Sequence, residues 1–105
     1  MMFDIIRRVF GMSPSANYKA LLKEGGRIVD VRSTAEYSTG HIKGSLNIPL
    51  ESLLSSLRRI DKNKAVITCC TSGMRSGTAK ALLREKGYSK VFNGGSWRSL
   101  QKKLR

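Results

Sequence analysis

The chain has 105 residues, 40% of them hydrophobic, and carries 20 Lys and Arg against 7 Asp and Glu, a net charge of +13. This length and composition fit one globular domain and exclude both a two-domain protein and a disordered chain. The only cysteines, Cys69 and Cys70, are adjacent and His41 is the sole histidine, which excludes a secreted disulfide scaffold and a zinc site of spaced Cys and His residues.

Residues 1–12 are predicted to form an N-terminal extension, either a short helix or irregular, ahead of one domain over residues 13–105. Asp4 lies where a signal peptide carries positive charge, and Arg7 and Arg8 interrupt the apolar run. No stretch of about 18 apolar residues occurs, so we expect no transmembrane helix.

Short apolar runs alternate with helical patterns, which predicts an α/β fold. The first predicted elements are a helix over residues 15–24, a strand over 27–32, a short helix from the capping box at 33–36 to Gly40, a strand over 45–49 and a helix over 50–60. They are followed by a strand over 65–69, a helix over 76–86, a strand over 90–92, a turn at 94–95 and a helix over 97–104. The strand over 65–69 is apolar enough for the centre of a parallel sheet.

The segment over residues 70–76 lies between a predicted buried strand and a predicted helix, where open α/β sheets bind ligands. The helix start supplies free N–H groups and a positive dipole end, and Gly73 lets the chain bend so that several amides point at one anion. A cysteine at the base of such a loop ionises easily, so Cys70 is the predicted nucleophile. The predicted substrate-binding residues are the rest of the segment: Thr71, Ser72, Gly73, Met74, Arg75 and Ser76.

Two chemistries fit this loop, and both use a cysteine nucleophile with main-chain stabilisation of negative charge. Counted from Cys70 the pattern is Cys-x-x-Gly-x-Arg, which suits transfer of a single sulfur atom. Counted from Cys69 it is Cys-x5-Arg, the spacing of cysteine-dependent phosphatases. The residues alone leave both open.

Four stretches resemble the rhodanese-like domain family, from about residue 15 onward. They are residues 28–32 with Glu36 and Tyr37, residues 40–44 with 47–49, residues 70–76, and Gly87 and Tyr88 with 93–95 and Trp97. Their order and spacing make the match specific. The resemblance implies a central, mostly parallel sheet of four or five strands with helices on both faces.

The resemblance also implies a single-domain thiosulfate sulfurtransferase. Such an enzyme moves a sulfane sulfur from thiosulfate or a similar donor to cyanide or a thiol acceptor, through a persulfide on Cys70. The loop would then run over residues 70–75, a length associated with sulfur substrates. Three residues are expected to support it: Asp30 by bonding loop amides, Arg32 by pairing with an acid or lining the cleft, and Cys69 as a packed strand residue or a resolving thiol.

The charge of +13 attracts anions, which leaves a second function open: a sulfur-carrier module that delivers persulfide sulfur to a protein or RNA. An acidic protein or a thioredoxin-like acceptor is favoured over nucleic acid, because aromatic residues are few and no RNA-binding motif occurs. We expect a cytoplasmic monomer with reduced cysteines, no metal and no cofactor.

Overall fold

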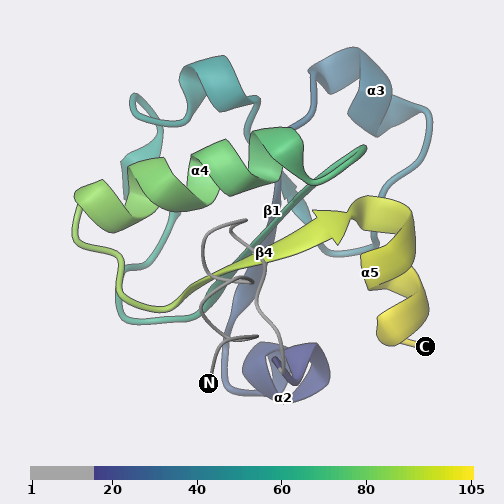
Figure 1. Cartoon of the computed structure of the whole chain (residues 1–105), viewed down its shortest axis with the longest axis horizontal. Coiled ribbons are helices and arrows are strands. Elements are labelled where there is room, and N and C mark those ends of the chain that lie inside the picture. The colour runs from purple at the N-terminus through teal and green to yellow at the C-terminus, as the bar shows by residue number, and fades with distance from the viewer. Residues whose placement is uncertain (1–15) are drawn as a thin grey trace, which may run out of the picture.

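A computed structural model describes residues 16–105 (Figure 1). Its four strands form one parallel sheet in the order β2-β1-β3-β4, with β1 at Arg27–Asp30, β2 at Leu46–Asn47, β3 at Val66–Cys70 and β4 at Val91–Ser96. All five residues of β3 are buried, as the apolar pattern predicted for a central strand. The sheet confirms the four-stranded form of the predicted fold. The extension predicted over residues 1–12 lies outside the described residues.

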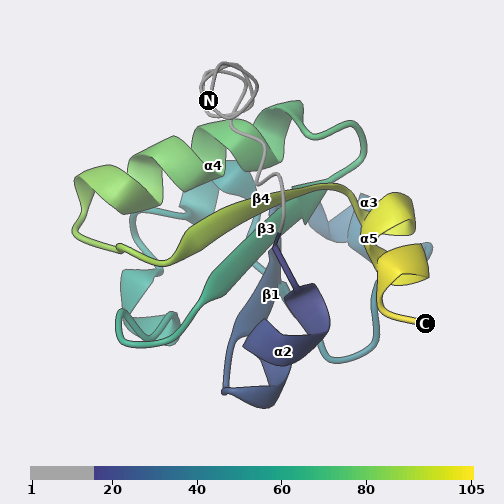
Figure 2. The ribbon, with the colours of Figure 1, turned by 60° about the horizontal axis from the view of Figure 1, so that its bottom comes forward.

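Helices cover both faces of the sheet, as expected (Figure 2). On one face lie α4 (Met74–Glu85) and two short 3-10 turns, η1 (Leu50–Ser52) and η2 (Leu57–Arg59). On the other lie α2 (Tyr18–Lys23) and α5 (Trp97–Lys103). The short helix α3 (Thr34–Ser38) follows β1 and begins with the predicted capping box of Ser33 and Glu36. No helix within residues 16–105 has the length and apolar character needed to cross a membrane.

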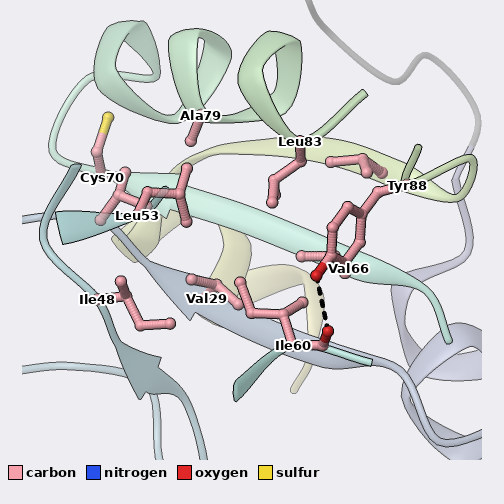
Figure 3. Packing of buried hydrophobic residues seen from close by; sticks show 11 residues of the cluster. Val29, Ile48, Leu53, Ile60, Val66, Cys70, Ala79, Leu83 and Tyr88 are labelled. Atoms are coloured by element: carbon pink, nitrogen blue, oxygen red, sulfur yellow. Dashed lines mark hydrogen bonds between the residues drawn. The ribbon is translucent and has the colours of Figure 1, made fainter. Parts of the chain in front are cut away.

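The two cysteines of β3 point to opposite faces of the sheet, because successive side chains on a strand alternate. Cys70 belongs to the hydrophobic cluster under α4, with Leu53 and Ala79 among its members. Figure 3 shows Cys70 at the edge of that cluster, with its sulfur toward the α4 side. Cys69 belongs to the cluster under α2 and α5. Adjacent positions in the sequence thus have separate environments.

The helix predicted over residues 50–60 is wrong, since the segment forms only the turns η1 and η2. The hydroxyl of Tyr88 donates to the carbonyl oxygen of Ile60 at 2.9 Å (Figure 3) and to that of Leu57 at 3.0 Å, a distant contact that favours a tighter turn there. The Ser55 hydroxyl donates to a carbonyl of η1 in the same way. The regular spacing of apolar residues in this segment instead reflects which side chains are buried, since Leu53 and Ile60 lie inside the core.

The turn predicted at residues 94–95 is also wrong, because β4 continues through it to Ser96. The pairing of β4 with β3 shifts between Thr68 and Cys70, which is a bulge that two glycines accommodate. A Cβ on Gly94 would lie 2.9 Å from Leu100 and 3.0 Å from the Thr68 carbonyl oxygen, so only glycine fits at this crossing. Elsewhere the predicted elements are present with ends shifted by a few residues; α4 begins at Met74 instead of residue 76.

Candidate active site

Cys70 is the last residue of β3, and the chain after it turns back on its sulfur. Gly73 is the N-cap of α4 and has a φ of 98°, a left-handed conformation that favours glycine. Its amide donates a hydrogen bond to the Cys70 Sγ at 3.0 Å. The Ser76 Oγ lies 3.4 Å from the same sulfur, from the first turn of the helix. The loop therefore aims the Gly73 amide at the thiol.

The surroundings of Cys70 favour its ionised form. Burial of the thiol opposes ionisation, but hydrogen bonds from the loop, the main-chain amides of Ser76, Gly73 and Ser72 among them, more than offset it and lower the pKa of Cys70 below its ordinary value. The sulfur also lies at the N-terminal end of a twelve-residue helix, whose dipole favours an anion. A thiolate held this way is the reactive form of cysteine.

Cys69 has the opposite environment. It is fully buried on the α2 and α5 face. Burial raises the pKa of its thiol, and the charge of Asp30 nearby raises it further. Both cysteines are free thiols. Cys69 therefore lies in the core as a neutral thiol, with its side chain turned away from the loop.

Arg75 forms an ion pair with Glu36, a residue that the sequence analysis did not select. Its two terminal nitrogens donate to the two carboxylate oxygens of Glu36 at 2.7 and 2.9 Å. The hydroxyl of Thr71 joins them, at 3.2 Å from each partner. The Arg75 guanidinium and the amide of Ser33 hold the pKa of the Glu36 carboxyl well below its usual range. The sequence signals for Glu36 were its capping position and its place in the first stretch that resembles the rhodanese-like domain family.

Asp30 and Arg32 form a buried ion pair beside the loop. The Arg32 guanidinium donates to both Asp30 carboxylate oxygens at 2.8–3.1 Å, and to the carbonyls of Glu36 at 3.2 Å and Gly40 at 2.7 Å. It also stacks 4.7 Å from the ring centroid of Trp97. Arg32 thus pairs with an acid, as expected. Asp30 bonds the amide of Arg32 and not those of residues 70–76, so the pair anchors α3 and with it Glu36.

The remaining loop residues separate into exposed and buried groups. Thr71, Ser72 and Met74 are exposed, and the Met74 side chain is 80% exposed. Ser76 is fully buried and bonds a second residue that the sequence analysis did not select, Asn93 of β4. The sequence signals for Asn93 were the two glycines that follow it and its place in the last stretch that resembles the rhodanese-like domain family. The predicted loop residues therefore gather around Cys70, some as its immediate donors and others as its solvent-facing rim.

This arrangement can perform nucleophilic chemistry on an electrophilic atom small enough to enter the loop. In such chemistry the Cys70 thiolate would be the nucleophile, and the amides at the start of α4 would stabilise negative charge at the sulfur. Within residues 16–105 no group of three His, Cys, Asp or Glu side chains is placed to hold a metal ion.

Comparison with known proteins identifies relatives of the chain. The sequence model of the rhodanese-like domain family matches residues 15–102. Thiosulfate sulfurtransferase PspE of Escherichia coli strain K12 is 36% identical over 74 residues, which cover 69% of this chain and 71% of that protein. Thiosulfate sulfurtransferase GlpE of Pseudomonas fluorescens strain SBW25 is 32% identical over 84 residues, 80% of this chain and 77% of that one.

The fold is also similar to that of a solved sulfurtransferase structure. The structure of the human single-domain sulfurtransferase TSTD1 superposes with a TM-score of 0.70 at 28% identity, covering 86% of this chain and 96% of that one. A match of the family's sequence model over most of the chain, relatives above 30% identity and a shared parallel sheet all lead to one assignment. This chain belongs to the rhodanese-like domain family.

Proposed function

We propose that the protein is a sulfurtransferase that takes a sulfane sulfur from thiosulfate, or a donor of the same chemistry, and carries it as a persulfide on Cys70. The observation that carries this proposal is the Gly73 amide at 3.0 Å from the Cys70 sulfur, within a loop that lowers the pKa of that thiol. The names of PspE and GlpE support thiosulfate as the donor.

The proposed reaction has two displacements at sulfur. The Cys70 thiolate attacks the outer sulfur of thiosulfate, the sulfur–sulfur bond of the donor breaks, and sulfite leaves with the electron pair. Cys70 then carries one extra sulfur with a negative charge. Cyanide or a thiolate attacks that outer sulfur, leaves as thiocyanate or a new persulfide, and returns Cys70 to its thiolate.

The loop supplies binding and charge stabilisation in both steps. The amides at the start of α4 face the sulfur that gains negative charge, and the exposed hydroxyls of Thr71 and Ser72 are available to donor oxygens. The positive charge of Arg75 is shared with Glu36 through two hydrogen bonds, which weakens its attraction for a sulfonate group.

A sulfur-carrier role is the second candidate, and it uses the same persulfide with a protein as acceptor. Met74 favours it, because an 80% exposed methionine at the loop offers an adaptable apolar contact. The net charge of +13 suits an acidic acceptor protein. The phosphatase alternative loses its basis, since Cys69 faces the opposite side of the sheet and burial raises its pKa.

Mass spectrometry after incubation with thiosulfate tests the proposal. We expect an adduct of about 32 Da, one sulfur atom, on the wild type and on Cys69→Ala, and none on Cys70→Ser. Added cyanide removes the adduct and releases thiocyanate. An adduct assigned to Cys69, or no adduct on the wild type, contradicts the proposal. Faster removal by a thioredoxin-like or acidic carrier protein than by cyanide supports the carrier role.

A further inference from the structure

Asn93 is a buried polar residue whose side chain contacts the loop from outside it. It lies on β4 beside the bulge and is 1% exposed. Its Nδ2 donates to the carbonyl oxygen of Gly73 at 3.1 Å. Its Oδ1 accepts the amide of Gly95 at 2.9 Å and the hydroxyl of Ser76 at 2.7 Å. One amide group thus joins the N-cap of α4, the bulge of β4 and the serine that contacts Cys70.

The neighbours of Asn93 leave its amide one orientation. A main-chain carbonyl only accepts hydrogen bonds and a main-chain N–H only donates them. The Gly73 carbonyl therefore requires the NH₂ group of Asn93, and the Gly95 amide requires its oxygen. A flipped amide would set donor against donor and acceptor against acceptor at both places. The group that faces Ser76 is accordingly the carbonyl oxygen.

That orientation decides where the Ser76 proton lies. Two oxygens 2.7 Å apart need a proton between them, and Asn93 Oδ1 carries none. The single hydroxyl proton of Ser76 is therefore directed at Asn93. The Ser76 oxygen, 3.4 Å from the Cys70 sulfur, presents a lone pair to it. In the resting protein the thiol of Cys70 is then the donor, in a chain that runs from Cys70 to Ser76 to Asn93.

We propose that Asn93 is a positioning residue for the reaction: by accepting the Ser76 proton it makes Ser76 an acceptor toward Cys70, and so limits how readily that sulfur ionises. The inference rests on the proposed role of Cys70 as nucleophile. An amide oxygen is not a base near neutral pH, so the chain fixes a direction and carries no proton away. On ionisation the proton leaves to water, and the amides at the start of α4 remain the donors to the sulfur.

This direction of the hydrogen bond has a chemical consequence for both forms of Cys70. The nucleophilicity of a thiolate falls as its pKa falls, so a sulfur that lacks the serine donor attacks a sulfane sulfur more readily once ionised. In the persulfide the negative charge lies on the outer sulfur and the Cys70 sulfur is neutral. With its proton directed at Asn93, Ser76 presents a lone pair to the Cys70 sulfur. This lone pair therefore destabilises the free thiolate more than the persulfide.

Two ionisable neighbours interact electrostatically with Cys70: Cys69, which precedes it on β3, and Arg75 in the first turn of α4, which is paired with Glu36. Apolar side chains packed in the same cluster include Leu53 of the segment after β2 and Ala79 of α4. None of these side chains changes in the variants below, so their electrostatic effect is common to all.

The test is a double-mutant cycle read as the pH dependence of Cys70 alkylation. The full-length wild type, Asn93→Ala, Ser76→Ala and the double variant react with iodoacetamide across pH, and fragment masses assign the label to Cys70. Asn93→Ala loosens Gly73 in either background but frees the Ser76 hydroxyl only where that hydroxyl exists. The difference between its two effects therefore isolates the direction of the Ser76 hydrogen bond.

We expect Asn93→Ala to lower the pH midpoint of Cys70 alkylation more in the wild type than in the Ser76→Ala background. The difference should be about half to one pH unit. Equal effects in the two backgrounds overturn the inference. If Asn93→Ala does not fold, Ser76→Ala decides alone: a midpoint that stays or falls supports the inference, and a rise overturns it. The titration needs no sulfur donor, so it stands or fails separately from the proposed sulfur transfer.

Discussion

Glu36 and Arg75 are 39 positions apart and meet in a paired contact, with two nitrogens of the guanidinium on two oxygens of the carboxylate at 2.7 and 2.9 Å. The pair joins α3 to the first turn of α4 and includes the Thr71 hydroxyl. Because Arg32 bonds the carbonyl oxygens of Glu36 in α3 and of Gly40 just after it, the loop is fixed from β1 through two successive ion pairs. The positive charge beside Cys70 is thus largely balanced by Glu36.

Removing Arg75 should make Cys70 harder to ionise. In Arg75→Met the thiolate loses an attractive charge, and Glu36 stays behind without its partner. We expect a higher pKa of Cys70 and persulfide formation on the order of tenfold slower at neutral pH. Stopped-flow measurement of sulfite release from thiosulfate gives the rate.

The control for this change is Arg84→Met, which removes the same charge from an exposed position in the last turn of α4. It should leave both the rate and the pKa near those of the wild type. Glu36→Gln added to Arg75→Met should restore part of the loss, because the unpaired carboxylate is gone. Equal effects of Arg75→Met and Arg84→Met would show that Arg75 acts only through the net charge.

The lowered pKa of Cys70 also predicts how stability depends on pH. A thiol whose pKa is lower in the folded protein than in the unfolded chain stabilises the fold. This contribution is fully present at pH values above the pKa of the unfolded chain, and it is lost as pH falls through the pKa of the folded protein. The ordinary value is 9.0. The free energy of unfolding of the wild type minus that of Cys70→Ser should therefore grow as pH rises toward 9.0. Urea unfolding at several pH values measures it, and a difference that shrinks with pH contradicts the prediction.

Local signals were enough to predict the parallel sheet and a loop that turns back on Cys70. The strand ending at Cys70 is a continuous run of buried residues, and Gly73 before a good helix indicates a turn that faces the helix dipole. Both features depend on residues adjacent in the chain. The capping box of Ser33 and Glu36 was likewise predicted and is present, since it spans only one turn.

The parts that sequence reasoning missed all depend on contacts between distant segments. Tyr88 reaches the carbonyls of residues 57 and 60 and favours two short turns over the helix that the leucine spacing predicted. Asn93 bonds Ser76 from another strand, and Glu36 bonds Arg75 from another helix. Each of these residues has an ordinary local reading, as a turn or cap residue, and only the packed fold shows its second contact.

The buried ion pair of Asp30 and Arg32 should dominate the stability of the site. Arg32→Met leaves the Asp30 carboxylate buried without its partner, which costs about 3 to 5 kcal/mol. The control is Arg98→Met, because Arg98 also lies over the Trp97 ring, at 5.3 Å, but is exposed. That change should cost less than about 1 kcal/mol. Chemical denaturation compares them, and Asp30→Asn added to Arg32→Met should recover part of the loss; similar costs for the two arginines would count against a buried pair.

The turn at Gly73 offers a separate test of whether backbone geometry or mere stability controls Cys70. Gly73→Ala places a Cβ in the left-handed region at a φ of 98°, and Gly44→Ala does the same at 86°. In neither case does the added carbon come closer than 3.4 Å to another segment, so the strain is conformational, about 1 to 2 kcal/mol for each. Both variants should lose similar stability in thermal unfolding.

Only Gly73→Ala should raise the pKa of Cys70, because of these two glycines only Gly73 donates its amide to that sulfur, at 3.0 Å. Alkylation of Cys70 across pH separates the two, and a shift of the same size in Gly44→Ala would mean that general loosening of the fold, and not the Gly73 amide, governs the thiol.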